Sequence, residues 1–239
     1  MEGIESVKRA NEFKEGLKKG IPIGLGYISV SITFGMLAVR GGLDIGTAVL
    51  ISMTNLTSAG QFAGIDLILN NAIYIELALT TFIINIRYSL MSFAISQRLE
   101  KVSLLKRMIL SFGITDETYA LASLEMGKLS YKFMLGLITC PYLGWVIGTF
   151  IGAISTAFMP VKLQDSLGIA LYGMFLAIII PASKRDNAVL KAIVISSLMS
   201  IGFFYFPVLK NISGGFSIII CSIVGAMIMA KLKPVKEEK

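Results

Sequence analysis

A single arginine lies in the middle of a long apolar stretch. Arg87 falls within the segment from Asn71 to Ser96, which is long enough to cross a bilayer, since about 20 residues suffice. A guanidinium in hydrocarbon is costly unless a partner or water receives it, and such residues mark functional sites by default. We therefore expect Arg87 to bind a substrate, with a structural ion pair that joins two elements as the alternative.

The helix predicted around Arg87 carries polar residues on more than one face. One polar stripe recurs at helical spacing and consists of Thr81, Asn85, Ser89, Ser92 and Ser96. A second line contains Glu76, Thr80 and Arg87. Glu76 would lie about 16 Å from Arg87 along the helix axis, at 1.5 Å per residue, so a direct ion pair between them is excluded. We expect Glu76 near the outer interface and seek the carboxylate partner of Arg87 elsewhere.

A first polar cluster surrounds a glycine in the segment from Thr54 to Gly64. The backbone can break at such small residues, and a broken helix exposes N–H groups that attract a carboxylate or C=O groups that attract a cation. Gly60 and Gly64 also fit the small-xxx-small pattern of close helix contacts, but close packing alone does not require so many amides and hydroxyls. The residues expected to line a substrate site with Arg87 are Asn55, Ser58, Gly60, Gln61 and Asn85.

A second cluster, from Gly113 to Tyr119, contains two adjacent acids after a glycine and a threonine. The threonine or the first acid could cap the start of a helix, which explains one acid but not two. We expect Asp116 or Glu117 to be the counter-ion of Arg87, the ligand of a substrate ammonium or a proton carrier. Asp66 is a weaker candidate for the same roles, and we expect it at the surface.

The composition places these clusters in a membrane protein. The chain has 239 residues, of which 55% are hydrophobic and 15% charged, and its mean hydropathy is +0.77. The apolar residues come in blocks of spanning length, without the short alternating segments of a β-barrel. The blocks run from 20 to 39, 72 to 96, 133 to 158, 166 to 181, 188 to 206 and 212 to 230. The sequence therefore predicts an all-α polytopic membrane protein with about six transmembrane helices, as one transporter domain over residues 1–239.

Two further segments, 44–70 and 108–125, are apolar but have polar centres. If each enters the membrane and returns on its own side, all but four of the 22 Lys and Arg become cytoplasmic, in agreement with the positive-inside rule. The prediction is then two oppositely oriented re-entrant or broken helical elements, with a possible inverted repeat and cytoplasmic tails at 1–19 and 231–239. A full crossing by one of the two segments is the alternative.

A ridge of small residues follows in the second half of the chain. It consists of Gly144, Gly148 and Gly152. Such spacing lets two helix backbones approach closely. We expect this ridge to pack against another helix, either within the chain or in a partner subunit.

The residue types exclude several chemistries. The chain has no histidine, so the commonest metal ligand and the usual proton shuttle near neutral pH are absent. Cys140 and Cys221 lie in separate apolar blocks and are expected to be packing residues. No nucleophile motif is present, so we expect no enzyme, catalytic residue, metal or cofactor. The net charge is +7, and the lysines and arginines lie in the short connections between apolar blocks. This distribution is typical of residues that set the orientation of a protein in the membrane, so we expect no nucleic-acid partner.

The clusters resemble, in order and spacing, the azaleucine-resistance (AzlC-type) family, the large subunit of bacterial and archaeal branched-chain amino acid exporters. The resemblance covers nearly the whole chain and rests on motifs at 21–27, 58–62, 85–88, 113–119 and 167–177. The motif Gly-Ile-Thr-Asp-Glu-Thr-Tyr at 113–119 is the most specific. Two departures affect the site, because Ser58 and Gly60 are exchanged relative to the usual order and Tyr88 stands where a histidine is frequent.

The resemblance implies a transporter that exports small apolar (branched-chain) amino acids. We expect a secondary transporter whose export is coupled to the proton gradient. The resemblance also implies a small helical membrane partner subunit of the AzlD type. From the residues alone, a passive channel for small polar solutes is the alternative, because paired re-entrant elements also allow it. In either case we expect a multi-pass protein of the cytoplasmic membrane, in contact with the lipid bilayer and with both termini in the cytoplasm.

Overall fold

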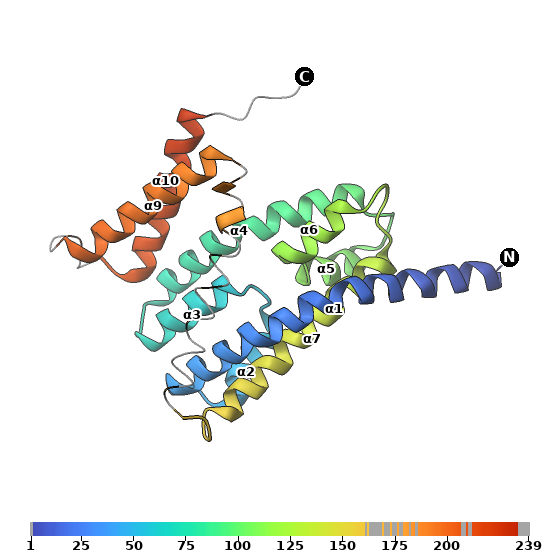
Figure 1. The fold of residues 1–239 in the computed structure, drawn as a ribbon, viewed down its shortest axis with the longest axis horizontal. Helices are drawn as coiled ribbons and strands as arrows, with labels where there is room; N and C mark the ends of the chain where they lie inside the picture. The colour runs from blue at the N-terminus through green and yellow to red at the C-terminus, as the bar shows by residue number, and fades with distance from the viewer. Residues whose placement is uncertain are drawn as a thin grey trace. The chain divides into compact units, whose positions relative to one another are not determined.

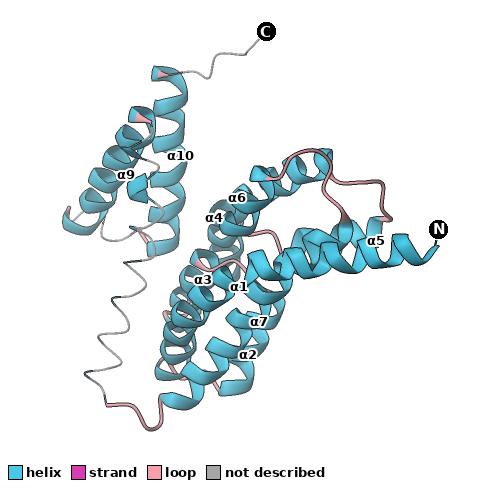
Figure 2. Cartoon of the chain, turned by 45° about the vertical axis from the view of Figure 1, so that its right-hand side comes forward, coloured by secondary structure: helices cyan, strands magenta, loops and turns pink. Residues whose placement is uncertain are grey.

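The computed structural model of the chain describes residues 2–160, 186–206 and 212–233, scattered positions between 161 and 185 and residue 209, with side chains from residue 12 onward. Within these ranges the regular elements are helices (Figure 2). They are α1 (Glu2–Arg40), α2 (Ile45–Thr54), α3 (Ala59–Leu69), α4 (Tyr74–Arg98), α5 (Leu104–Phe112), α6 (Asp116–Leu124), α7 (Tyr131–Ser155), α9 (Asn187–Tyr205) and α10 (Gly214–Leu232).

Five of these helices are long and apolar enough to cross a membrane, namely Glu12–Arg40 within α1, α4, α7, α9 and α10. This confirms the predicted all-α polytopic membrane protein. The predicted span at 166–181 falls largely outside the described residues, and so does most of the predicted tail at 231–239. The predicted tail at 1–19 is helical and continuous with the first span, because α1 begins at Glu2.

The chain forms two compact units. The first consists of residues 1–62 and 85–170, and the second of residues 63–84 and 171–239. Helices α3 and α4 each pass from one unit into the other. The predicted polar clusters at 113–119 and around Arg87 belong to the first unit, as does the start of α3.

Helices α1 and α7 lie side by side and form the centre of the first unit (Figure 1). They run in the same direction, because the glycines of α1 meet α7 in chain order, from Gly16 at Phe133 to Gly35 at Thr149. A Cβ built on Gly24 would lie only 2.7 Å from the carbonyl oxygen of Cys140. The α7 glycines that meet the α1 backbone in the same way are Gly136, Gly144, Gly148 and Gly152. The predicted glycine ridge is therefore an internal helix contact, which only residues without a side chain allow.

Helices α2 and α3 are joined by a short turn, and together they are called the α2–α3 hairpin. Between them, Asn55 is extended with φ −142° and Ser58 adopts φ +46°, a left-handed conformation that is uncommon for a residue with a side chain. Gln61 Nε2 donates a hydrogen bond to Ser52 Oγ at 3.2 Å across this break. In a continuous helix these two residues would be separated by about 13 Å along the axis, so the chain turns back at residues 55–58.

Helices α5 and α6 form a second hairpin. Arg107 near the start of α5 donates a hydrogen bond to Ser96 of α4, and Arg98 of α4 donates one to the carbonyl of Ala122, near the end of α6, at 3.2 Å. Both ends of this hairpin therefore lie at the C-terminal end of α4. An apolar cluster that includes Leu110 and Ile114 packs the hairpin against α7. The chain thus enters and leaves at one end, as predicted for a re-entrant element.

The second unit contains α9 and α10, which pack against each other. Glu76, near the start of α4, is 4% exposed and accepts hydrogen bonds from the Ser213 hydroxyl and, at 3.1 Å, from the Gly215 N–H. Its carboxylate thereby satisfies one free N–H group at the start of α10, that of Gly215. Glu76 therefore bonds α10 and not Arg87, in agreement with the axial distance of about 16 Å between them calculated from the sequence.

Candidate functional site

Arg87 forms an ion pair with Asp116. Its Nη1 lies 3.0 Å from Asp116 Oδ2, and the two side chains are 36% and 30% exposed. Arg87 belongs to the middle of α4, whereas Asp116 is the first residue of α6, at the tip of the α5–α6 hairpin. The sequence left the choice between Asp116 and Glu117 open, and the geometry selects Asp116 as the partner.

Tyr88 connects this ion pair to the tip of the other hairpin. Arg87 Nη2 donates to the Tyr88 hydroxyl at 3.2 Å, and this hydroxyl donates to the carbonyl of Thr57 at 3.1 Å. The Arg87 guanidinium also lies over the Tyr88 ring, 5.0 Å from its centroid, where the ring's negative face attracts a cation. A continuous set of polar contacts therefore runs from Asp116 through Arg87 and Tyr88 to the break at residues 55–58.

Gly60 lies against the side chains of two polar neighbours. A Cβ built on Gly60 would lie 2.7 Å from Asn85 Nδ2 and 2.7 Å from Thr57 Oγ1, closer than Cβ atoms approach such groups. Thr57 Oγ1 in turn donates to Asn55 Oδ1 at 2.7 Å. The absence of a side chain at Gly60 thus allows Asn55, Thr57 and Asn85 to gather at the start of α3.

Gln61 is 2% exposed and reaches the centre of the first unit. Its Nε2 donates to Ser52, whose hydroxyl lies 2.7 Å from Thr149 Oγ1 of α7. Ser58, also predicted, is half-buried at the turn, and its carbonyl accepts the N–H of Gln61 at 2.8 Å. The structure therefore brings the predicted uncharged residues to one hairpin tip.

Three buried polar atoms at this site have no hydrogen-bond partner among the described residues: Gln61 Oε1, Asn85 Oδ1 and Arg87 Nε. Leaving a buried polar atom unsatisfied costs about 1–3 kcal/mol. Such groups occur in proteins where a ligand or a water molecule supplies the missing hydrogen bond. The three predicted residues therefore offer two acceptors and one donor to a bound molecule.

Glu117 points to a different neighbour. It accepts a hydrogen bond from the hydroxyl of Tyr27 in α1, and the Tyr27 ring packs edge-on against Trp145 of α7 at 5.3 Å between centroids. The start of α6 is capped by Thr115 and Thr118, each of which bonds the backbone N–H of the other. Capping therefore requires neither acid, and the capping explanation for Asp116 is wrong.

Asp66, the weaker candidate, lies outside the site. It is exposed in the second half of α3, and its side chain accepts a hydrogen bond from Asn70 at 3.2 Å. This agrees with the surface position expected from the sequence.

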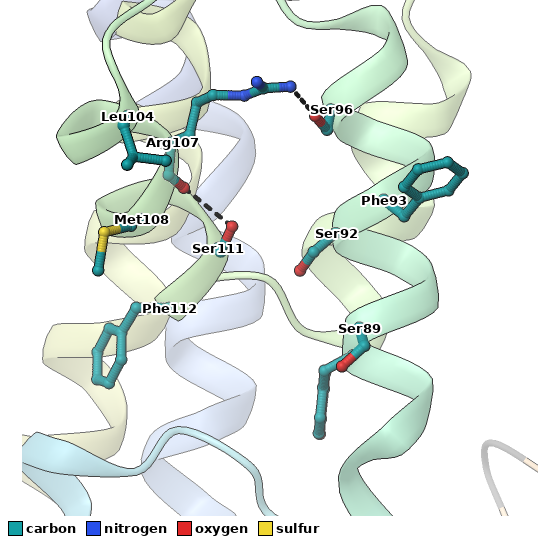
Figure 3. A pocket seen from close by; sticks show the side chains of 10 residues that line it. Ser89, Ser92, Phe93, Ser96, Leu104, Arg107, Met108, Ser111 and Phe112 are labelled. Carbon is teal, nitrogen blue, oxygen red and sulfur yellow. Dashed lines mark hydrogen bonds between the residues drawn. The ribbon is translucent and has the colours of Figure 1, made fainter.

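A cavity of about 820 Å³ extends along α4 and α5 (Figure 3). Tyr88 lines one end, and Arg107 and Ser96 line the other. The wall from α4 includes Ser89 and Ser92, which belong to the polar stripe recognised in the sequence. This part of the stripe therefore lines a cavity that also contains Tyr88, a hydrogen-bond partner of Arg87.

Sequence reasoning missed several residues that hold the site together. They are Tyr27, Ser52, Tyr88 and Thr149. Tyr88 was noted only as a departure from the family pattern, and Thr149 lies inside the glycine ridge, where only packing was expected. The one available signal was the placement of these hydroxyls within otherwise apolar helices, since a hydroxyl in such a setting requires a partner.

The fold and the site define a polytopic helical membrane protein in which two broken helical hairpins meet an arginine at the middle of a spanning helix. The chain belongs to the AzlC family, because the family model described as "AzlC protein" matches residues 22–159. This confirms the family recognised from its motifs. No solved structure matches the chain.

Several relatives match most of the chain. An "Uncharacterized membrane protein" of Archaeoglobus fulgidus is 32% identical over 212 residues, which cover 83% of this chain and 92% of the relative. The "Inner membrane protein YgaZ" of Escherichia coli is 27% identical over 228 residues, which cover 91% of each chain. An "Uncharacterized membrane protein" of Helicobacter pylori strain J99 is 26% identical over 180 residues, 73% of this chain and 77% of the relative. The similarity thus extends over most of each relative's length.

Proposed function

We propose that this protein is a secondary transporter that exports small apolar amino acids, in particular branched-chain ones, across the cytoplasmic membrane without changing them chemically. One observation carries the proposal: Arg87 is paired with Asp116 at 3.0 Å where the tips of two broken hairpins meet. Broken helices of this kind bind substrates in many transporters, since their free ends and polar residues can face an ion inside the membrane. The AzlC family membership supports the same function.

A zwitterionic amino acid matches both partners of the ion pair. Its carboxylate would bind the Arg87 guanidinium in a charge-assisted pair, and its ammonium would bind Asp116. The unpartnered atoms of Gln61, Asn85 and Arg87 would complete the remaining hydrogen bonds of the substrate. Each charge would exchange one partner for another, so neither protein charge would be left unpaired during binding.

The proton gradient would drive export through Asp116. In its ionised form Asp116 would bind the substrate ammonium on the cytoplasmic side. After the site has opened to the outside, a proton from that side would neutralise the carboxylate and release the ammonium. This proton would leave to the cytoplasm once the empty site faces inward again, so that one proton enters as one amino acid leaves. We further propose that a small helical membrane subunit of the AzlD type assists the chain, that the chain lies in the cytoplasmic membrane and that both termini are cytoplasmic.

The test is efflux of radiolabelled leucine or valine from preloaded cells. We expect Arg87→Ala and Asp116→Asn each to slow efflux at least about 100-fold, equivalent to about 2.7 kcal/mol. Asp66→Asn is the matched control, since it removes an exposed acid outside the site and should leave efflux unchanged. Normal efflux by either site variant at normal protein levels would refute the assignment.

An uncoupler separates this transporter from a passive channel. Export against a concentration gradient should stop when the proton gradient is dissipated. Efflux that only ever follows the amino acid gradient, with or without the uncoupler, would instead support a channel.

A further inference from the structure

We propose that the cavity between α4 and α5 is the route by which the amino acid reaches Arg87 from the cytoplasm, and that Arg107 at its far end binds the substrate carboxylate first. This inference rests on the proposed export function and names the route and the first binding position of the same substrate. It assigns a role to Arg107, which the ion pair at Arg87 does not require.

The lining of the cavity fits an apolar amino acid. Its volume of about 820 Å³ lies in the range of small-molecule sites, about 300–1,000 Å³. Its lining includes serine hydroxyls of α4 and the apolar side chains of Leu104, Met108 and Phe112 from α5. Of the α5 side chains, Arg107 and Ser111 point toward α4 (Figure 3). A molecule with a charged end and an apolar side chain could therefore contact both the polar and the apolar part of this lining.

Two serine hydroxyls of α4, those of Ser89 and Ser92, are available to bind a ligand. Ser and Thr in helices often donate to a backbone carbonyl one turn earlier, as Thr81 does to Leu77 at 2.7 Å and Ser111 does to Arg107 at 2.9 Å. Ser89 and Ser92 form no such bond and have no hydrogen-bond partner among the described residues. Their hydroxyls can therefore accept and donate hydrogen bonds inside the cavity.

Arginines stand near both ends of this serine-lined wall. Tyr88 at the inner end bonds Arg87, and Arg107 at the outer end is exposed and donates to Ser96 Oγ. Arg87 and Ser96 are nine residues apart in α4, or about 13 Å along its axis.

Arg107 forms no ion pair with any residue that the structure describes. An unpaired guanidinium at the mouth of a cavity raises the local concentration of carboxylates. The substrate can therefore pass from one guanidinium to the next along the serines.

The first test measures accessibility of introduced cysteines in inside-out vesicles. Ser89→Cys and Ser92→Cys should react with a membrane-impermeant thiol reagent, and leucine should protect both from the reagent. Leu90→Cys is the matched control, because Leu90 is 69% exposed and does not line the cavity; leucine should not change its labelling. The parent chain with its two native cysteines sets the background. Absence of leucine protection at both serine positions would overturn the proposed route.

The second test separates capture from the later steps. Arg107→Ala should raise the KM for internal leucine about fivefold, as expected for loss of one exposed charge pair, and leave kcat within about twofold. Arg107→Lys should recover part of the lost affinity. Lys101→Ala removes a positive charge from the connection that precedes α5, where Lys101 is exposed, and should leave KM unchanged.

The outcomes distinguish this inference from the proposed function. An unchanged KM in Arg107→Ala would overturn the role of Arg107. An equal rise of KM in Lys101→Ala would also overturn it, because any positive charge on this surface would then have the same effect. If the wild-type chain exports amino acids while both tests fail, only the route is wrong. A wild-type chain that exports no amino acid would refute the proposed function and the route together.

Discussion

The two hairpins meet at one site but contribute different chemistry. The tip of α2–α3 offers amides and hydroxyls, with Asn55, Thr57 and Gln61 and no charged side chain. The tip of α5–α6 offers the carboxylate that pairs with Arg87. A carboxylate neutralises the charge of a guanidinium inside a membrane, whereas uncharged dipoles can adapt to ligands of different shape. We therefore expect the α5–α6 hairpin to balance the charge of Arg87 and the α2–α3 hairpin to adapt to the shape of the ligand.

The hairpins also start their second helices differently. Helix α3 follows Ser58, whose φ of +46° is the uncommon left-handed conformation, while α6 starts with a capping box formed by Thr115 and Thr118. The threonines satisfy the helix start, so Asp116 and Glu117 remain available for other contacts. The acidic hairpin is therefore built on a regular cap, and the uncharged one on an irregular turn.

The largest effect should come from removing the charge pair as a whole. Arg87→Gln and Asp116→Asn should each lower the Tm of the purified protein, because an uncompensated charge is left inside the fold. The double variant should recover most of the lost Tm but not leucine efflux. Thermal unfolding and vesicle transport would be measured on the same preparations. Recovery of efflux in the double variant would show that the pair serves only to join two elements.

A smaller effect should follow from filling the space at the uncharged tip. Gly60→Ala places a Cβ 2.7 Å from the amide nitrogen of Asn85, so we expect leucine efflux to fall about tenfold, or about 1.4 kcal/mol. Gly64→Ala is the control in the same helix, since its Cβ would lie 3.6 Å from the Thr81 methyl group, an ordinary contact. Equal efflux in the two variants would contradict the proposed close approach at Gly60.

Removal of the α6 cap should have a moderate effect. Thr115→Ala should reduce the free energy of unfolding by about 1 kcal/mol and also slow efflux, because the cap positions Asp116. Ser130→Ala removes the cap of α7, where Ser130 accepts the Phe133 N–H at 3.1 Å, and should cost similar stability with no effect on efflux. Denaturation and transport assays would compare them. If both variants lost efflux, the loss in Thr115→Ala would be due to lower stability alone.

The smallest effect concerns pH, because the first hairpin begins with an ionisable cap. The Asp44 carboxylate accepts hydrogen bonds from the Thr47 hydroxyl and, at 3.0 Å, from the Thr47 N–H. These bonds, the hydroxyl's most of all, lower the pKa of Asp44 below its ordinary value. Its contribution to stability is present above the ordinary pKa, near 3.9, and is lost as the pH falls through the lower folded pKa. Amide exchange of Thr47, corrected for intrinsic rates, should therefore accelerate in that window.

Asp44→Asn provides the control for this pH effect, because asparagine also caps a helix but does not titrate. The variant should show no acceleration of Thr47 exchange over the same pH range. The start of α6, with its threonine cap, should be equally insensitive. Acceleration in Asp44→Asn would mean that another group is responsible.

The sequence predicted the main parts of this site for a clear physical reason. A charge in an apolar helix requires a partner, and few acids lie near the apolar segments, so the sequence indicated the acids at 116–117 as candidate partners of Arg87. Helix breaks were similarly visible as small and polar residues at 54–64 and 113–119. The helical fold followed from the lengths of the apolar blocks.

The choice between neighbouring residues could not be predicted. Asp116 and Glu117 are consecutive in a helix and point about 100° apart, so the partner of each depends on where α1 and α4 lie. Tyr88 follows Arg87 directly, and adjacent helical residues do not face each other. Its hydroxyl nevertheless lies 3.2 Å from Arg87 Nη2 and 3.1 Å from the carbonyl oxygen of Thr57. Such contacts depend on tertiary placement, which local spacing does not encode.

The contact between α1 and α7 limits how this protein can move. Glycine at Gly24 and Gly144 leaves no side chain between the two backbones, and a shift of one helix along the other would drive larger side chains into main-chain atoms. In a transport cycle these two helices would therefore serve as a stationary frame. The moving parts would be the short hairpins, whose breaks already supply hinges on both sides of Arg87.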